Sequence, residues 1–315
     1  MSDKVALVTG GAGFIGSHIV DRLVDDGWRV AVIDNLSSGR TEYVNPQAEL
    51  HEIDICDEGL GEVIRKISPD RVFHLSAQIS VSVSTREPLL DARINVFGML
   101  NLLEALRSLE THRAAGLPGF VFASTGGAIY GEPERNPVSE EVFPRPESPY
   151  AAAKLSCEGY LSVYRAAYGL NSTILRLGNI YGPRQDPHGE AGVIAIFTRA
   201  MLGGDPVKIF GDGEDGRDYV YVSDAVRAFM IAADRGGSGP YNIGTGTVTT
   251  VNHLARELTM LTEWRGQPEY LPPREGDIHK ISLNAERAGR DLGWAPSVEF
   301  VDGLIKTVEF FRDQT

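Results

Sequence analysis

The chain has 315 residues, of which 42% are hydrophobic and 23% charged, the mixture of an ordinary globular protein with one or two domains. Its formal net charge of −13 gives a surface that repels phosphate backbones and anionic lipids, which argues against nucleic acid and membranes as partners. Cys56 and Cys157 belong to no CxxC pair, so neither a disulfide framework nor a structural zinc site is expected.

Two further classes are excluded by pattern. No apolar run reaches the roughly 18 residues that span a membrane, and the start of the chain lacks the apolar core of a signal peptide, so we expect a cytoplasmic protein. His74, His188 and His279 are scattered without the spacing of metal ligands, and no metal site is expected.

The first half of the chain alternates strand-like apolar runs with helical patterns. We predict strands over residues 4–10, 29–35, 48–57, 70–77, 119–125 and 171–183. We predict helices over residues 13–27, 60–69, 89–110 and 148–169. Apolar strands separated by helices indicate a parallel sheet covered on both faces, which predicts a doubly wound α/β (Rossmann) fold.

The composition changes after residue 180. Residues 181–192 and 210–219 are rich in Gly, Pro and charge and predict long loops of the kind that contact ligands. Helical patterns return at 192–204, 222–236 and 250–264, and residues 218–233 are expected to return to the large sheet. We predict a Rossmann domain over 1–178, with 218–244 returning to it, and a smaller C-terminal lobe from 179–217 and 245–315.

The strongest local motif is the loop "GGAGFIG" at residues 10–16. It satisfies GxGxxG and also places Gly10, Gly13 and Gly16 at every third position. The loop follows a strand and opens a helix, so its backbone N–H groups can approach a pyrophosphate at the helix N-terminus. This context predicts a dinucleotide site.

Asp34 ends the second predicted strand. An acidic residue there suits the two ribose hydroxyls of NAD and repels the extra phosphate of NADP. Arg40 lies nearby and leaves NADP open as the alternative, but the pattern favours NAD.

Tyr150 and Lys154 lie four positions apart on a predicted helix and therefore share one face. A free phenol has a pKa near 10, so a base near neutral pH needs that pKa lowered by about 3. An adjacent ammonium and a positive nicotinamide ring would both favour the phenolate. Ser124 and Thr125, which end the strand 119–125, supply hydroxyls for a substrate oxygen, although strand-end capping is the simpler reading of them alone.

Together these motifs resemble the extended short-chain dehydrogenases/reductases of the NAD-dependent epimerase/dehydratase family, and most closely its UDP-glucose 4-epimerase type. The resemblance extends over essentially the whole chain. Besides the glycine loop it rests on "DI" at 54–55, "HLSAQ" at 74–78, Asn95, "STGGAIYG", "YAAAK", "LRLGNIYGP", "GRDYVYVSD", "YNIGTG" and "PPREGD".

The resemblance implies which residues contact NAD. They are Gly10, Gly13, Phe14, Ile15 and Gly16 at the pyrophosphate, Asp34, Asn35, Leu36, Ser37, Ser38 and Gly39 at the adenosine ribose, Asp54 and Ile55 at adenine, Leu75, Ala77 and Gln78 beside the nicotinamide, and Asn95, Tyr150 and Lys154.

The resemblance also implies a set of substrate contacts. Thr125 and Tyr150 would meet the sugar, Asn179, Val193, Arg217 and Arg274 the diphosphate, Phe210 the uracil and Asp277 the uridine ribose. Two arginines on otherwise acidic loops are what a doubly charged diphosphate needs.

One position departs from the pattern of many relatives. They carry Ser or Thr four residues before the tyrosine that corresponds to Tyr130, whereas this chain has Gly126. The catalytic hydroxyl is therefore Thr125 or Ser124, and the sequence leaves that choice open.

The residues after Thr125 separate the reactions of the family. The resemblance would predict Asp-Glu there in a 4,6-dehydratase and a Glu in a decarboxylase, but this chain has Gly126 and Gly127. It therefore implies a UDP-sugar 4-epimerase of the UDP-glucose/UDP-galactose type, acting by transient oxidation at C4 with tightly bound NAD, rotation of the 4-keto sugar and hydride return. The alternatives are a UDP-glucuronate or UDP-N-acetylhexosamine 4-epimerase, or a net oxidoreductase or dehydratase.

The sugar pair and the nucleotide stay open at the sequence level. The family suggests a homodimer in which the helix from about 90 to 109 pairs with the helix after Tyr150.

Overall fold

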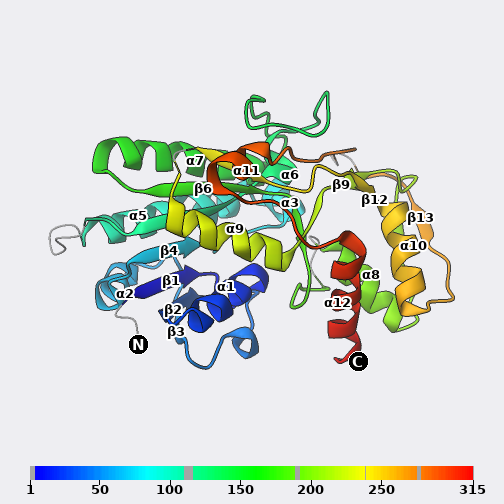
Figure 1. Ribbon diagram of the computed structural model, residues 1–315, viewed down its shortest axis with the longest axis horizontal. Coiled ribbons are helices and arrows are strands. Elements are labelled where there is room, and N and C mark those ends of the chain that lie inside the picture. The colour runs from blue at the N-terminus through cyan, green and yellow to red at the C-terminus, as the bar shows by residue number, and fades with distance from the viewer. Residues whose placement is uncertain (1–3, 110–115, 189–191, 238, 275–277, 315) are drawn as a thin grey trace. The chain divides into compact units, whose positions relative to one another are not determined.

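The computed structural model describes residues 4–109, 116–188, 192–237, 239–274 and 278–314 (Figure 1). The contacts between residues divide the chain into two compact units. The first unit comprises residues 1–125, 148–176 and 226–241, and the second comprises 126–147, 177–225 and 242–315.

The first unit is built on a seven-stranded sheet of order β11-β6-β5-β4-β1-β2-β3. The strands are β1 (Val5–Thr9), β2 (Arg29–Asp34), β3 (Glu49–Glu52), β4 (Arg71–His74), β5 (Gly119–Thr125), β6 (Ser172–Leu177) and β11 (Pro240–Ile243). The pairs β1–β2, β2–β3, β1–β4 and β4–β5 are all parallel. The predicted doubly wound α/β fold is confirmed.

Helices cover this sheet because its strands are apolar on both faces (Figure 1). The helices are α1 (Phe14–Asp25), α2 (Leu60–Ile67), α3 (Val81–Arg86), α4 (Pro88–Ala92), α5 (Gly98–Arg107), α7 (Pro149–Tyr168) and α9 (Val222–Arg235). Val5 and Leu7 of β1 join a core with Leu60, Leu102 and other residues of α2, α5 and α7. Their neighbours in β1 point to the opposite face because strand side chains alternate, and α1 packs against β1 and β2.

The helix predicted over 89–110 is divided. A π-helical turn, η2 (Arg93–Phe97), separates α4 from α5. Wider turns leave carbonyls without their usual partners, and both cysteines bond to this turn. Cys56 donates its thiol to the carbonyl of Arg93 at 3.3 Å, and Cys157 donates to that of Asn95 at 3.2 Å. Both cysteines are free thiols.

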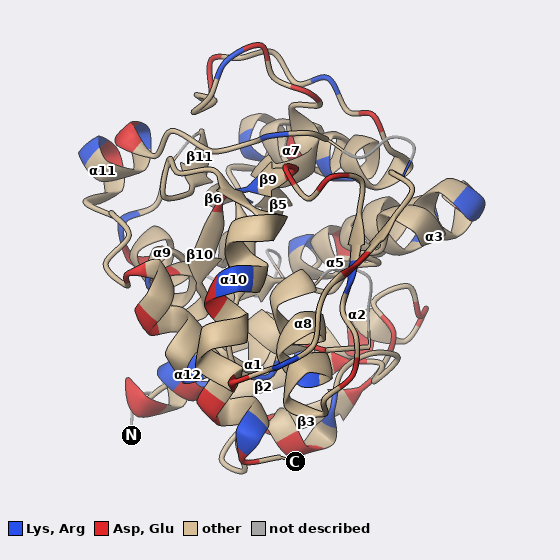
Figure 2. Cartoon of the chain, turned by 90° about the vertical axis from the view of Figure 1, so that its right-hand side faces the viewer, with Lys and Arg blue, Asp and Glu red and all other residues tan. Residues whose placement is uncertain are grey.

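The second unit contains short strands and helices. They are α6 (Gly126–Ile129), β7 (Asn179–Tyr181), α8 (Val193–Leu202), β8 (Lys208–Phe210), β9 (Gly216–Arg217), β10 (Tyr219–Tyr221), β12 (Thr249–Thr250), α10 (Val251–Thr262), β13 (Glu269–Leu271), α11 (Glu286–Leu292) and α12 (Phe300–Arg312). The strands form the pairs β10–β7, β12–β9 and β13–β8. In α12 the buried residues recur every three or four positions, which gives the helix one apolar face. Figure 2 shows charged residues along the same helix.

These units differ from the predicted boundaries in two places. Residues 126–147 belong to the second unit, where Val138 donates its N–H to Ser282 and Tyr130 donates its hydroxyl to Asn242, each at 2.8 Å. Of the segment 218–244 that was predicted to return to the large sheet, residues 226–241 belong to the first unit and β11 joins β6, whereas β10 pairs with β7 in the second unit. The strands β7, β10 and β11 are only three or four residues long, so the sequence carries no hydrophobic pattern that distinguishes these pairings. Among the described residues, no helix is long and apolar enough to cross a membrane.

Candidate active site

The glycine loop joins β1 to α1 and leaves no room for side chains. Gly10 has φ +71°, and a Cβ there would lie 2.8 Å from the backbone nitrogen of Ser76. A Cβ on Gly16 would overlap the carbonyl of Gly10. Gly13, the residue before α1, provides no side-chain cap, so the first N–H groups of the helix are left to a ligand. This cradle of backbone fits a pyrophosphate, and Phe14 and Ile15 stand half-buried at its helical side.

Asp34 lies buried at the end of β2 and faces the loop after this strand. Its carboxylate accepts the N–H of Ala12 at 3.0 Å and that of Leu36 at 2.9 Å. A Cβ on Gly39 would lie 2.8 Å from Oδ1 of Asp34, so this glycine closes over the carboxylate. The remaining residues of the loop are half-buried or exposed: Asn35, Leu36, Ser37 and Ser38.

Arg40, the residue that leaves NADP open as the alternative cofactor, is already paired. The guanidinium of Arg40 lies 3.3 Å from Glu42 and over the ring of Tyr43 at 5.8 Å. A neighbouring carboxylate offsets the charge that a 2′-phosphate would need. The surroundings of Asp34 and Arg40 therefore fit the ribose of NAD better than that of NADP.

Asp54 and Ile55 follow β3 and have different surroundings from each other. Asp54 accepts bonds from Asn35 Nδ2 and from the N–H of Cys56, both at 2.7 Å. Partial burial acts to raise the pKa of Asp54, but these bonds outweigh it and lower that pKa. Ile55 is buried in the core beside Gly98, and its carbonyl accepts Asn101 Nδ2 at 2.8 Å, so its side chain is not available to a ligand.

His74, to which the sequence analysis assigned no role of its own, is buried and ties β1 to β4. His74 Nδ1 lies 2.7 Å from the hydroxyl of Thr9, which also accepts the N–H groups of Leu75 and Ser76 at 3.3 Å. Burial, and secondarily the ammonium of Lys154, lower the pKa of His74 to about 3, so its ring is neutral. The signal in the sequence is a polar residue at the end of each of two neighbouring strands.

Tyr150 and Lys154 lie in the first turns of α7. The helix starts there because Ser148 caps it, accepting the N–H of Ala151 at 3.2 Å, and Pro149 follows in the first turn. Lys154 is 4% exposed and donates its ammonium to the carbonyl of Ala123 at 3.0 Å. Its nitrogen lies 6.0 Å from the centre of the Tyr150 ring.

The two ionisable groups have pKa values shifted toward their neutral forms. Burial raises the pKa of Tyr150 to about 12, which a hydrogen bond from Thr125 reduces and the charge of Asp91 increases. Burial lowers the pKa of Lys154 to about 8, against the opposing effects of Cys157 and Asp91. The predicted phenolate therefore does not form from these side chains alone at neutral pH, and a further positive charge is required.

The two hydroxyls that end β5 have different partners. Thr125 bonds to the hydroxyl of Tyr150, whereas Ser124 donates to Oε1 of Glu158 at 2.6 Å. Glu158 in turn accepts two bonds from Arg176, the shorter at 2.6 Å. Successive side chains of a strand point to opposite faces, which separates the two hydroxyls.

Asn95 and Gln78 form a closed pair of amides. Asn95 accepts the N–H of Gln78 and donates to its carbonyl, both at 3.0 Å. The side chain of Gln78 bonds to the backbone of Ser80 and donates to Asp91 at 2.8 Å. Leu75 and Ala77 lie half-buried in the same segment. Sequence reasoning missed Asp91, which lies four residues before Asn95 and also bonds to it at 2.9 Å.

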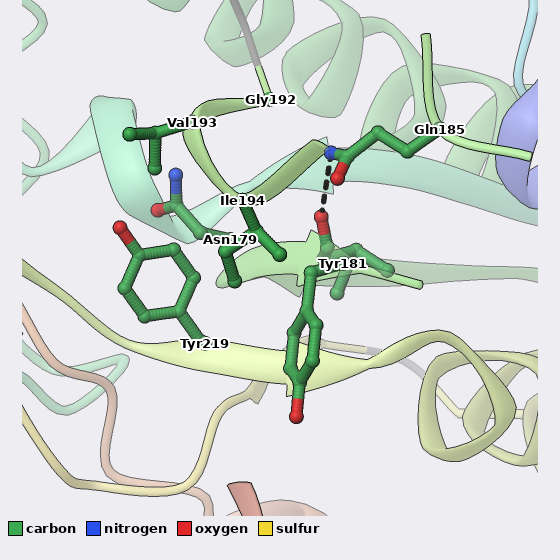
Figure 3. A pocket seen from close by; sticks show the side chains of 8 residues that line it. Asn179, Tyr181, Gln185, Gly192, Val193, Ile194 and Tyr219 are labelled. Carbon is green, nitrogen blue, oxygen red and sulfur yellow. Dashed lines mark hydrogen bonds between the residues drawn. The ribbon is translucent and has the colours of Figure 1, made fainter. Parts of the chain in front are cut away.

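In the second unit, Asn179 and Val193 line one small pocket (Figure 3). Figure 3 shows the hydroxyl of Tyr219 pointing toward the amide of Asn179 and the side chain of Val193. Val193 opens α8 without a side-chain cap, so N–H groups of its first turn are available there. Gln185 closes the pocket, and its Nε2 donates to the carbonyl of Ile180 at 3.0 Å.

The predicted base and diphosphate contacts of the second unit lie on two strands and one loop. Arg274 stacks over Phe210, with 3.8 Å between the guanidinium carbon and the ring centre. Arg217, in β9, is half-buried and donates to the carbonyl of Gly216 at 3.0 Å. Asp277 lies outside the described residues. In the part of the chain that is described, no group of three or more His, Cys, Asp or Glu could hold a metal ion.

Known proteins resemble this chain over nearly its whole length. The profile of the NAD dependent epimerase/dehydratase family matches residues 6–244. UDP-glucose 4-epimerase from Mycolicibacterium smegmatis is 45% identical, with 98% of this chain and 99% of the relative covered. The structure of UDP-glucose 4-epimerase from Thermotoga maritima with UDP-glucose has a TM-score of 0.95 and 50% identity, covering 98% of this chain and 99% of that one.

A second solved structure, which holds a different ligand, is similar to this chain to nearly the same extent. UDP-glucose 4-epimerase from Thermus thermophilus, in complex with NAD, has a TM-score of 0.92 and 45% identity, covering 99% of this chain and 100% of that one. The family profile covers more than half of the chain, and the resemblance drawn from the motifs is confirmed. The chain belongs to the NAD-dependent epimerase/dehydratase family.

Proposed function

We propose that this chain is a UDP-sugar 4-epimerase that interconverts UDP-glucose and UDP-galactose with NAD held as a bound group. The observation that carries the proposal is the position of Lys154, which is buried one turn along the helix from Tyr150 with its nitrogen 6.0 Å from the centre of the phenol ring. The relatives named above share this activity over nearly the full length of the chain.

NAD fits the first unit. The backbone cradle of Gly10, Gly13 and Gly16 would hold its pyrophosphate, and Asp34 the adenosine ribose. Bound NAD would supply the acceptor of the hydride from C4 of the sugar and, once reduced, its donor. The other proposed contacts are Phe14, Ile15, Asn35, Leu36, Ser37, Ser38, Gly39, Asp54, Ile55, Leu75, Ala77, Gln78 and Asn95.

Tyr150 is the proposed acid and base. Its phenol oxygen takes the proton of the sugar 4-hydroxyl and returns a proton to the oxygen once the configuration has changed. Thr125 hydrogen-bonds that phenol, and Lys154 holds a fixed ammonium one turn along the helix. The positive nicotinamide ring of bound NAD would supply the further charge that favours the phenolate. We assign the catalytic hydroxyl to Thr125, because Ser124 is committed to Glu158.

Residues of the second unit are proposed to hold the nucleotide. Arg217 and Arg274 would bind the diphosphate through charge-assisted hydrogen bonds, together with Asn179 and the start of α8 at Val193. Phe210 offers an aromatic face to the uracil, and Arg274 stacks on the same ring. The proposed assignment is thus NAD to the first unit and nucleotide sugar to the second.

The absence of a side chain at Gly127 favours epimerisation within the family. A Cβ at this position would lie 3.1 Å from Oδ1 of Asn179. A larger acidic residue here would displace that amide, and neither Gly126 nor Gly127 can move a proton. The chain therefore lacks, at these two positions, the group that elimination or decarboxylation needs.

The test is conversion without added cofactor. The purified protein is incubated with UDP-glucose, and separately with UDP-galactose, and the products are resolved by chromatography. Arrival at one equilibrium mixture from both sides supports the proposal. UDP-N-acetylglucosamine and UDP-glucuronate serve as comparison substrates. Conversion of one of these two without conversion of UDP-glucose and UDP-galactose contradicts the hexose assignment.

We also propose a homodimer formed through the outer faces of α4, η2 and α7. Large apolar side chains stand exposed there: Leu89 is 86% exposed, Val163 56% and Phe97 53%. Both α4 and η2 pack against α7. Exposed apolar side chains on elements that pack together are typical of an interaction site, and a second copy offers the matching surface. Light scattering should give the mass of a dimer for the parent and of a monomer for Phe97→Asp combined with Val163→Asp. A parent protein with the mass of a monomer would contradict the dimer.

A further inference from the structure

Asp91 is a buried carboxylate that no part of the proposed reaction uses. It is 1% exposed, in α4. Its Oδ1 accepts Gln78 Nε2 at 2.8 Å and Asn95 Nδ2 at 2.9 Å. Its Oδ2 is equally buried and has no hydrogen-bond partner among the described residues. An ionised group in this position is costly unless a positive charge compensates for it.

Lys154 supplies a positive charge of this kind. Helix α4 packs against α7, which carries Lys154, and the two groups attract each other electrostatically. Both are 4% exposed or less. Five of the six lysines, Lys4, Lys66, Lys208, Lys280 and Lys306, are exposed, so Lys154 is the exception.

A chain of hydrogen bonds also links Asp91 to the helix that carries Lys154. Asn95, which bonds to Asp91, accepts the thiol of Cys157 at its carbonyl. Cys157 lies three residues after Lys154 and hence on the same side of α7. The carboxylate of Asp91 therefore fixes Gln78 and Asn95 and, through Cys157, the register of the helix that carries Tyr150 and Lys154.

We propose that Asp91 is a positioning residue that serves as the buried counter-charge of Lys154 and keeps its ammonium protonated at working pH. This inference rests on the proposed roles of Tyr150 and Lys154. The other titratable groups that interact with Asp91 also lie on α7: Tyr150 and Cys157. The arginines of the adjoining elements, Arg86 of α3 and Arg93 of η2, are exposed.

The direction of the effect follows from charge. Burial lowers the pKa of Lys154, and Cys157 and then Asp91 act to raise it, which leaves that pKa at about 8. Removing the carboxylate charge should move it lower still. The same change should lower the pKa of Tyr150, because Asp91 raises it. Asp91 therefore makes the phenolate of Tyr150 harder to form, and it stabilises the protonated ammonium of Lys154.

The test is the titration of Lys154 in protein labelled with [ε-13C]lysine, followed by NMR. Lys154→Arg identifies the resonance, and the parent protein should show one lysine titrating near pH 8. In Asp91→Asn, which keeps an acceptor oxygen for Gln78 and Asn95, the midpoint should fall by about one pH unit. Asp91→Glu should restore it, and Glu87→Gln, an exposed carboxylate next to α4, should leave it unchanged.

An unchanged Lys154 midpoint in Asp91→Asn overturns the proposal, even if the variant is less stable. Should that variant fail to fold, Lys154→Met tests the pair from the other side. The side-chain amide resonances of Gln78 and Asn95 report the protonation of Asp91. Loss of the Lys154 ammonium should raise the pH at which these resonances shift, and an unchanged midpoint overturns the proposal. These readouts need no substrate, so absence of epimerase activity in the parent protein rejects the proposed function without deciding this one.

Discussion

Ser124 donates its hydroxyl to Glu158 across 2.6 Å, inside a buried network that Arg176 completes. The neighbouring Thr125 bonds instead to the phenol of Tyr150. Two adjacent hydroxyls that the sequence could not rank are thus separated by the alternation of one strand. One of them stabilises a buried ion pair, and the other meets the proposed base.

This difference predicts opposite phenotypes for two conservative variants. Thr125→Val should lower kcat by about 10²-fold at little expense of stability, because it removes a hydroxyl that acts at the reacting oxygen. Ser124→Ala should lose about 1–3 kcal/mol of unfolding free energy, because a hydrogen bond to a buried charged group is lost, while kcat changes far less. Steady-state kinetics and urea denaturation of both variants check this, and a larger kcat loss in Ser124→Ala would reverse the assignment.

Gly10→Ala should abolish the retention of NAD. The new Cβ would press against the backbone of Ser76 in a conformation of φ +71°. Gly27→Ala is the matched control, since Gly27 has φ +81° but no atom within 4 Å of the added Cβ. It should cost about 1–2 kcal/mol of stability and keep its NAD. The NAD released from each denatured protein is measured by chromatography, and equal contents in the two variants would contradict the cradle.

Gly127→Ala should weaken substrate binding more than it slows turnover. Its Cβ would lie 3.1 Å from Oδ1 of Asn179, which must then shift away from its proposed diphosphate contact. We expect KM for UDP-glucose to rise about fivefold, equivalent to about 1 kcal/mol. Gly159→Ala, in α7 with open space around the added Cβ, is the control. A KM that does not differ between the two variants would remove Asn179 from the substrate site.

Acid should destabilise the protein through His74. Its folded-state pKa is about 3, below its ordinary value of 6.5, so the unfolded chain binds more protons between those limits. Stability is therefore lost as the pH falls from 6.5 toward 3, by about 2 kcal/mol at pH 5 from this group alone. Urea denaturation at pH 7 and pH 5 should show a smaller loss for His74→Gln, relative to its own value at pH 7, than for the parent. The exposed His253→Gln should behave like the parent, and an equal loss in all three would contradict the neutral, buried ring.

The parts of this site that could be predicted from sequence depend on neighbours in the chain. The glycine loop and the pair Tyr150–Lys154 each lie within seven residues, where turn geometry and helical spacing determine the arrangement. Strand and helix alternation likewise predicted the sheet.

The features that could not be predicted depend on partners far apart in sequence. Thr9 and His74 are 65 residues apart, and Ser124 and Glu158 are 34 apart. The π-helical turn that divides the helix predicted over 89–110 accompanies contacts with Cys56 and Cys157, which no periodicity reveals. In the sequence, Asp91 is one acidic residue of a helix, and its burial depends on the packing of α4 against α7.

The most direct measurement is the rate at which Tyr150→Phe interconverts UDP-glucose and UDP-galactose, with its NAD content determined on the same sample. The phenylalanine keeps the ring and removes only the oxygen that exchanges the proton with the sugar. We predict a rate reduced by about 10²–10⁴-fold with NAD content unchanged. Interconversion at the parental rate would contradict the assignment of Tyr150 as the acid and base of this enzyme.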